Sequence, residues 1–244
     1  MRKSLAVFLI AVFAWPATSL VAGIALPNLP PGSHYQLIFV TADSIGATSP
    51  DISTYNTFVN AEAALNSSLP STTWHALTST PTVDADVNAP TGGLPIYNTQ
   101  GVEVASAATG LWAPNLSLIN PVGFDQYGNP STSLVWTGTA AGGINNGGYS
   151  LGGSQHQSTA GQTNLDVWPE WFSTASLNTD VYAEPLYAVS SELTIPTPEP
   201  STMVLACLAA TGLAVSSLRR CQLSIFLQAH MKRQNLCNFY RQRR

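Results

Sequence analysis

Hydrophobic residues follow different patterns in different parts of the chain. Near each end lies an apolar run without a charged residue, at residues 5–15 and 203–218, whereas the long middle part alternates short apolar stretches with clusters of Gly, Pro, Asn and Ser. Long uncharged apolar runs are typical of segments that enter a membrane, and short stretches between turn residues are typical of β-strands. The pattern predicts four parts: residues 1–25, 26–195, 196–220 and 221–244.

The middle part predicts one α+β domain with short antiparallel strands and one main helix. Residues 35–40 are rich in β-formers and indicate a buried strand. The run Ser49-Pro50-Asp51 predicts a helix start, with Ser49 as the N-cap and Pro50 at the first helical position. Apolar residues then recur at helical spacing and extend the helix to about Asn66: Ile52, Tyr55, Phe58, Val59 and Ala63.

Later strands are predicted from short β-forming stretches between turn residues. They lie at residues 73–77, at 94–97 and 102–105 as a hairpin around 98–101, at 134–137 and at 186–195. In the last of these, apolar side chains alternate, which indicates a half-buried strand: Tyr187, Val189, Leu193 and Ile195. Because the first and last strands bracket the domain, we expect them to pair.

Charge separates the middle part from both ends. It has no Lys and no Arg between Ile24 and Pro198, and 12 of the 13 acids lie there, so 0 minus 12 gives a formal charge of −12 against −4 for the whole chain. Nucleic acid is excluded as a partner, since its phosphates require Lys and Arg. The three cysteines, Cys207, Cys221 and Cys237, all follow this part, so the domain must be stable without disulfides.

The N-terminus has the features of a signal peptide. Met1-Arg2-Lys3 is positively charged, the apolar run follows it, and the small residues Ala17-Thr18-Ser19 and Gly23-Ile24-Ala25 are candidate cleavage sites for signal peptidase. The sequence therefore predicts export through the inner membrane and removal of residues 1–25.

The C-terminus combines an extended Pro-rich segment, an apolar run and a basic stop. These are Pro198, Glu199, Pro200, Ser201 and Thr202, then the predicted transmembrane helix at 203–218, then Arg219 and Arg220. This order resembles the PEP-CTERM sorting signal of Gram-negative bacteria. The resemblance implies cleavage by an exosortase, release to the cell surface or extracellular space, and association with exopolysaccharide and biofilm.

The basic tail at 221–244 departs from that family, whose members normally end a few residues after the basic cluster. We expect the tail to stay cytoplasmic, as a membrane-surface helix with its basic end on anionic lipid or as an uninformative extension.

A second resemblance concerns the middle part. The predicted element order, together with Trp136-Thr137-Gly138-Thr139 and Leu186-Tyr187, resembles bacterial surface domains with a C-type-lectin-like or endostatin-like fold. Members of that superfamily usually carry disulfides, which this domain lacks.

Two short motifs are candidates for chemistry. Gly148-Tyr149-Ser150-Leu151-Gly152 matches the nucleophile elbow of serine hydrolases, but no predicted strand precedes it and no helix follows it, so a loop is the simpler interpretation. A secreted hydrolase would need His156 beside Ser150, and an Asp. Asp84, Asp86 and Asn88 are spaced like the start of a Ca²⁺ loop.

The rest of an EF-hand loop is missing, because Ala89 stands at the glycine position and Pro95 at the position of the closing Glu. A looser Ca²⁺ site completed by remote acids, or a solvated turn, stays open for these residues. The histidines His34, His75 and His156 show no metal-binding spacing, so no other cofactor is predicted.

Trp168 and Trp171 are the aromatic candidates for an exposed ligand-binding surface, whereas Trp136, in a β-forming stretch, is expected in the core. The sequence as a whole predicts a non-enzymatic exported surface or matrix protein whose partners are signal peptidase, exosortase and extracellular polysaccharide. The alternatives are a permanently anchored single-pass binding protein and a secreted hydrolase.

Overall fold

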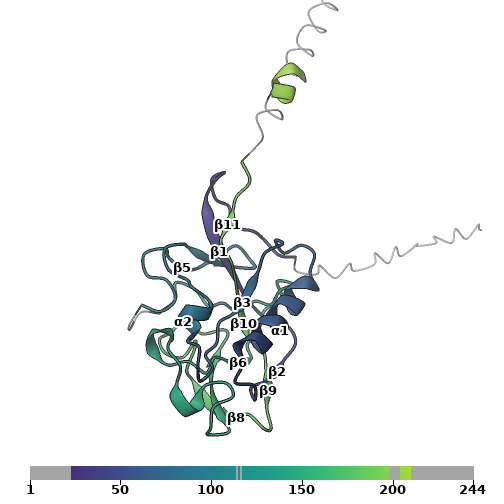
Figure 1. Ribbon diagram of the computed structural model, residues 1–244. Coiled ribbons are helices and arrows are strands. Elements are labelled where there is room, and N and C mark those ends of the chain that lie inside the picture. The colour runs from purple at the N-terminus through teal and green to yellow at the C-terminus, as the bar shows by residue number, and fades with distance from the viewer. Residues whose placement is uncertain (1–22, 114, 116, 198–203, 210–244) are drawn as a thin grey trace, which may run out of the picture. The chain divides into compact units, whose positions relative to one another are not determined.

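The computed structural model describes residues 23–113, 115, 117–197 and 204–209 (Figure 1). The chain divides into two compact units, Met1–Thr194 and Ile195–Arg244, called here the N-terminal and C-terminal units. The described part of the N-terminal unit is mostly strands and loops, with one helix of 13 residues. The predicted mixture of α and β structure with one main helix is therefore confirmed.

Short elements make up the N-terminal unit. In chain order they are β1 (His34–Val40), β2 (Ile45–Gly46), α1 (Ile52–Ala64), β3 (Trp74–Ala76), α2 (Ala85–Asn88), β4 (Ile96–Asn98), β5 (Glu103–Ala105), β6 (Leu134–Trp136), the 3₁₀ helices η1 (Ala141–Gly143) and η2 (Gly147–Tyr149), β7 (Gln157–Gln162), β8 (Ala175–Asn178), β9 (Ala183–Glu184), β10 (Tyr187–Ser190) and β11 (Leu193–Thr194).

The main sheet has the strand order β3-β10-β1-β4-β5, and β11 adds to β1. β1 pairs antiparallel with β10, with Ile38 opposite Val189, and with β11, with His34 opposite Thr194. The prediction that the first and last strands pair is confirmed. Figure 1 shows β1, β10 and β11 lying together along the length of the unit.

The all-antiparallel expectation is wrong at one pair of strands. β1 and β4 run parallel, with Leu37 opposite Tyr97. A parallel neighbour requires a long crossover, and the chain between these strands contains α1, β3 and α2. The predicted hairpin is confirmed, since β4 and β5 are antiparallel and the Asn98 side chain accepts hydrogen bonds from the backbone N–H groups of Gln100 and Val102 in the turn.

The last predicted strand, 186–195, is interrupted and is not half-buried. All four residues of β10 are buried, and a bend at Ser191 separates β10 from β11. β10 is an inner strand between β1 and β3, and because its side chains are buried on both faces of the sheet, the apolar alternation does not correspond to one solvent-exposed face.

Helix α1 forms where the sequence predicts it but begins with a different cap. The Asp51 carboxylate accepts a hydrogen bond of 2.9 Å from the backbone N–H of Ser53, so Asp51 is the N-cap and Pro50 precedes it. The predicted Ser49 cap is wrong. Ser49 lies two residues earlier, and its hydroxyl contacts Thr54 at 2.9 Å.

Asparagine side chains cover the open edge of β3. Asn60 accepts from the Trp74 N–H at 3.0 Å and donates to the Trp74 carbonyl at 2.6 Å. Asn56 accepts from the Ala76 N–H at 2.9 Å, and Asn88 donates to the Ala76 carbonyl at 2.7 Å. These amides take the place of a neighbouring strand and block pairing with another chain.

A second sheet, β6-β7-β8, packs on the first through a shared aromatic core. Val135 on β6 belongs to this core, and the next residue, Trp136, is fully buried, as predicted. The buried Tyr187 hydroxyl on β10 donates a 3.0 Å hydrogen bond to the Trp171 carbonyl. Gly161 on β7 lies so close to the same carbonyl that a Cβ would overlap it.

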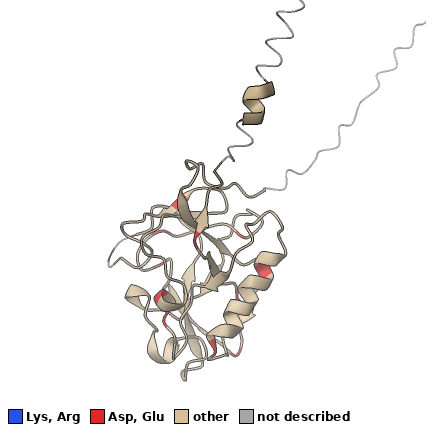
Figure 2. Cartoon of the chain, turned by 45° about the horizontal axis from the view of Figure 1, so that its top comes forward, with Lys and Arg blue, Asp and Glu red and all other residues tan. Residues whose placement is uncertain are grey.

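Acidic residues are scattered over the N-terminal unit, and no Lys or Arg occurs in the described part of the chain (Figure 2). Residues 204–209 of the C-terminal unit are helical. Across the residues that the structure describes, no helix combines the length and the apolar character needed to cross a membrane. Most of the predicted anchor at 203–218, the predicted signal peptide up to residue 22 and the tail at 221–244 lie outside those residues.

Candidate functional site

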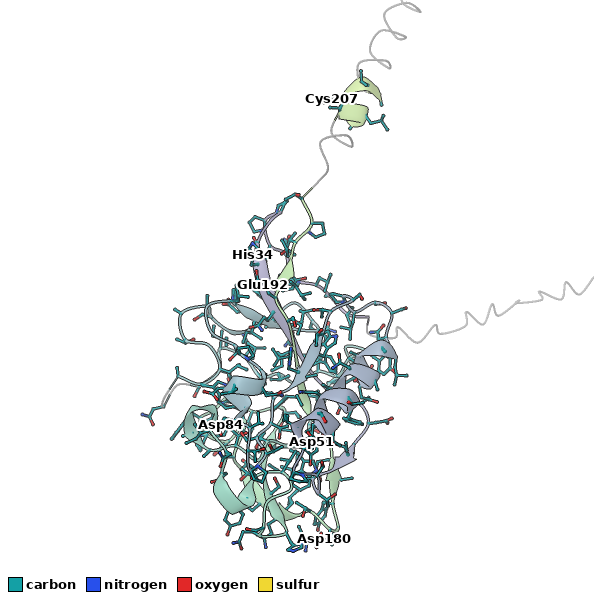
Figure 3. All side chains as sticks on the ribbon, viewed as in Figure 1. His34, Asp51, Asp84, Asp180, Glu192 and Cys207 are labelled. Carbon is teal, nitrogen blue, oxygen red and sulfur yellow. The ribbon has the colours of Figure 1, made fainter. Side chains whose placement is uncertain are left out.

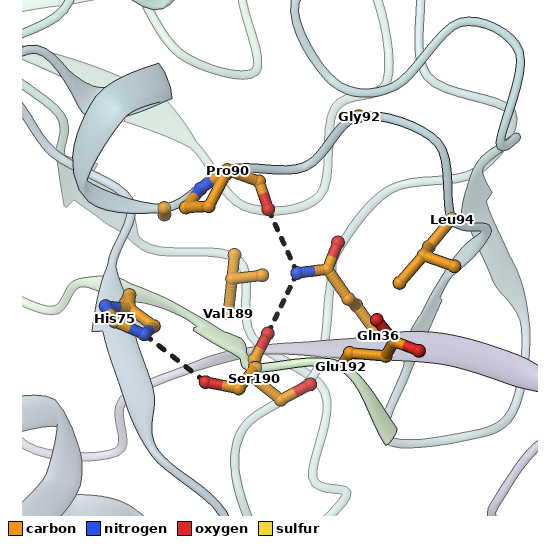
Figure 4. A pocket seen from close by; sticks show the side chains of 10 residues that line it. Gln36, His75, Pro90, Gly92, Leu94, Val189, Ser190 and Glu192 are labelled. Atoms are coloured by element: carbon orange, nitrogen blue, oxygen red, sulfur yellow. Dashed lines mark hydrogen bonds between the residues drawn. The ribbon is translucent and has the colours of Figure 1, made fainter. Parts of the chain in front are cut away.

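A cavity of about 300 Å³ opens where β10 and the following bend meet the segment after α2 (Figure 4). We call it the Gln36 pocket. Its polar side chains come from β1, β3 and the β10–β11 bend, and its apolar wall comes from β10 and residues 89–94. The residues that line it are Gln36, His75, Ala89, Pro90, Gly92, Leu94, Val189, Ser190, Ser191 and Glu192.

Gln36 is held rigidly at the base of this pocket. It is 6% exposed, and its amide nitrogen donates to the carbonyls of Ser190 at 2.9 Å and Pro90 at 3.1 Å. Since both partners are carbonyl acceptors, they determine which end of the amide is nitrogen. The amide oxygen Oε1 is consequently directed away from them, toward the space between Pro90 and Leu94 (Figure 4).

His75 and Ser191 form the opposite side of the pocket. The His75 Nε2 lies 3.4 Å from the Ser191 hydroxyl. Desolvation by burial lowers the pKa of the His75 imidazole, which favours the neutral ring. Among the described residues no carboxylate hydrogen-bonds to His75, so this pair lacks the orienting third member of a catalytic triad.

Glu192 lies at the rim of the pocket, and among the described residues only one of its two carboxylate oxygens contacts another side chain. Its Oε1 contacts His34 Nδ1 at 2.5 Å, and both side chains are more than half exposed. Figure 3 places His34 and Glu192 together at the end of the unit where β1 and β11 lie, with Asp180 at the opposite end. Within the described part of the chain nothing hydrogen-bonds to Glu192 Oε2, which leaves an acceptor for a ligand.

Sequence reasoning did not single out this pocket. Gln36 and Ser190 are 154 residues apart, and only the pairing of β1 with β10 brings them together. One signal was present in the sequence, because Gln36 is a polar residue inside a predicted buried strand. A polar side chain in such a position needs hydrogen-bond partners inside the protein. A polar atom of that side chain that has no such partner can accept a hydrogen bond from a ligand.

Trp168 and Trp171 do not form the exposed aromatic surface that the sequence predicts. Trp171 is fully buried, and its ring lies 5.2 Å from that of Trp112 and 5.0 Å from that of Phe172, measured between centroids. The expectation that it is exposed is wrong, because the turn at residues 168–172 directs its side chain into the core. Trp168 is half-buried against the same core.

Two of the three Ca²⁺ candidates hydrogen-bond to different parts of the fold. Asp84 Oδ1 accepts from both the backbone and the side-chain nitrogen of Asn145 at 2.7 Å, and Asn88 Oδ1 accepts from Asn56 Nδ2 at 2.8 Å. Asp86 Oδ1 is buried without a hydrogen-bond partner. No group of three or more His, Cys, Asp or Glu residues in the described ranges could hold a metal ion.

The Gly-Tyr-Ser motif has none of the geometry of a nucleophile elbow. Ser150 follows η2, is fully buried, and donates its hydroxyl to the Gly147 carbonyl at 2.7 Å. His156 instead contacts Asp180, with Nδ1 to Oδ2 at 3.2 Å, and both of these side chains are exposed. The structure therefore does not join Ser150 and His156 into one site.

The predicted sorting residues Pro198, Glu199, Pro200, Ser201 and Thr202, with Arg219 and Arg220, lie outside the described residues. No protein-family model matches the chain, and no curated protein sequence matches it.

Proposed function

We propose that this chain is a non-enzymatic exported protein that an exosortase sorts through a C-terminal PEP-CTERM signal and that acts at the cell surface or in the extracellular matrix. The observation that carries the proposal is the position of the last strand of the N-terminal unit, which ends before the predicted cleavage motif. Its last strand pairs with its first, with Thr194 opposite His34, four residues before Pro198. Cleavage near Pro198 would leave every strand of that unit in place.

Composition supports export of this unit. After removal of residues 1–25 it would carry no Lys or Arg and no Cys, and it would therefore fold in an oxidising compartment without depending on disulfide formation. Its buried hydrophobic core and its sheets provide the packing that disulfides supply in smaller exported domains. We further propose a C-type-lectin-like or endostatin-like fold, supported by the paired terminal strands and the single main helix, and an experimental structure would test it.

Processing of the C-terminus tests the function directly. In an exosortase-containing Gram-negative host, we expect the protein recovered from the surface or medium to lack residues beyond the Pro198-Glu199-Pro200 region. Replacement of Glu199 by Ala should block that cleavage, because the exosortase would no longer find its recognition residue, and the intact mass should then be found in the membrane fraction.

A control substitution, Glu192→Ala, removes an equal charge before the motif and should leave processing unchanged. Recovery of the intact polypeptide from the wild-type host, basic tail included, would contradict the proposal and favour a permanently anchored binding protein.

A further inference from the structure

The Gln36 pocket offers two hydrogen-bond acceptors, one held rigidly in the fold and one on an exposed side chain at the rim. Gln36 Oε1 is directed into the cavity because its amide nitrogen is committed to two carbonyls. Glu192 contributes Oε2, since its other oxygen already contacts His34. A ligand that suits this pocket must therefore present N–H or O–H donors to it.

The negative charge of Glu192 and of the domain around it favours a ligand whose donor group is positively charged. The described part of the chain holds no Lys or Arg that would compete for Glu192, and the stretch from Ile24 to Pro198 has 0 Lys or Arg against 12 acids, or −12 with His counted as neutral. Burial lowers the pKa of the His75 imidazole, which favours the neutral ring and so reduces its repulsion of a cation. A hydrogen bond between charged partners is stronger than one between neutral groups.

Size limits the ligand to a small molecule or a single side chain. The cavity of about 300 Å³ is at the lower end of the range found for ligand pockets. Leu94, Val189 and Pro90 supply an apolar wall that can cover a short carbon skeleton while the polar base receives its donors.

We propose that the Gln36 pocket binds a primary ammonium group on a compact carbon skeleton, held between Gln36 Oε1 and Glu192 Oε2. Aminosugars and lysine side chains share this chemistry. The inference deepens the proposed extracellular role by naming a class of ligand. It rests on that proposed role only for the source of the ligand, which would be extracellular.

Binding to the full chain in a mild detergent tests the site. We would titrate glucosamine, N-acetylglucosamine and Nα-acetyl-lysine amide by calorimetry and by saturation-transfer NMR. At least one of the two ammonium compounds should bind saturably, and N-acetylglucosamine, which lacks the positive charge, should bind about tenfold more weakly than glucosamine or not at all. Tighter binding of glucosamine would identify the natural ligand as part of a polysaccharide. Tighter binding of the lysine compound would identify it as a protein side chain.

Two matched variants locate the site. Glu192→Gln should weaken binding of the ammonium compound about tenfold, because it removes the charge and keeps the shape. Glu170→Gln removes the same charge from an exposed residue outside the pocket and should leave binding unchanged.

The inference is overturned if no ammonium compound saturates at millimolar concentration, if glucosamine binds and the acetylated sugar binds as tightly, or if both variants behave alike. None of these results depends on exosortase cleavage, so a failure here is distinguishable from a failure of the sorting proposal.

Discussion

His75 illustrates how a single residue responds to its place in the fold. It lies on β3 and is half-buried, and desolvation lowers the pKa of its imidazole from the ordinary value of 6.5. The folded protein therefore takes up a proton at His75 less readily than the unfolded chain does. The stability that depends on neutral His75 is complete above about pH 6.5 and is lost as the pH falls from there through the lower folded value.

We predict that His75→Gln makes stability less sensitive to pH in this window. The free energy of unfolding of the wild type should fall more steeply than that of the variant as the solution is acidified below pH 6.5, measured by urea denaturation at a series of pH values. Parallel curves for the two proteins would show that His75 titrates alike in the folded and unfolded states.

Gly161 is a residue whose identity is required by its neighbours. A side chain at this position would overlap the Trp171 carbonyl and the Phe172 Cα, both of which are backbone atoms that cannot rotate away. We predict that Gly161→Ala lowers the free energy of unfolding by about 3 kcal/mol through overpacking.

Gly46→Ala is the matched control for that substitution. Gly46 also lies in a strand, but a Cβ there meets no atom within 4 Å, so the change should alter stability by less than about 0.5 kcal/mol. Equal effects of the two substitutions in thermal or urea denaturation would show that the close approach at Gly161 has no energetic consequence.

At the scale of elements, α1 both packs on β3 and completes its hydrogen bonding. Asn60 alone satisfies the N–H and the carbonyl of Trp74, two groups of an edge strand that are partly removed from water. We predict that Asn60→Ala destabilises the protein by about 2 kcal/mol, because these backbone groups lose their partners. Urea denaturation measures the effect, and dynamic light scattering should also detect association through the newly open edge.

Thr57→Ala serves as the control on the same helix. Thr57 is exposed, so its replacement should change stability by no more than about 0.5 kcal/mol. If Asn60→Ala were equally mild and the variant stayed monomeric, the role assigned to the Asn60 amide would be refuted.

Much of the secondary structure could be predicted from the sequence, because it depends on the local pattern of hydrophobic and turn-forming residues. The run from Tyr35 to Val40 forms β1, the apolar spacing after Asp51 forms α1, and Asn98 with Gly101 turns the β4–β5 hairpin. The cap was misassigned because Ser49 and Asp51 both suit that position, and the choice between them depends on where the chain turns into the helix.

The whole molecule has an unusual electrostatic balance. Its described part contains acids and no Lys or Arg, and the ion pairs there involve only His34 and His156. The charge interactions among the Asp and Glu residues of this described part are therefore repulsive. We predict that NaCl raises the urea midpoint of unfolding, because salt screens this repulsion.

Sodium chloride and an uncharged osmolyte such as sucrose act differently in this experiment. The effect of salt should be largest at low ionic strength and level off as screening becomes complete, whereas sucrose should act in proportion to its concentration. A midpoint that stays constant or falls as NaCl is added would contradict the predicted repulsion.

The sequence by itself determined the absence of Lys, Arg and Cys between Ile24 and Pro198, the place of the main helix and most of the strands, because composition and hydrophobic periodicity are local properties of the chain. Only the tertiary structure decided that β4 runs parallel to β1, that Trp171 is buried, and that Gln36, His75 and Glu192 share a pocket. Those features depend on contacts between residues far apart in sequence, whose register and facing side chains no local pattern specifies.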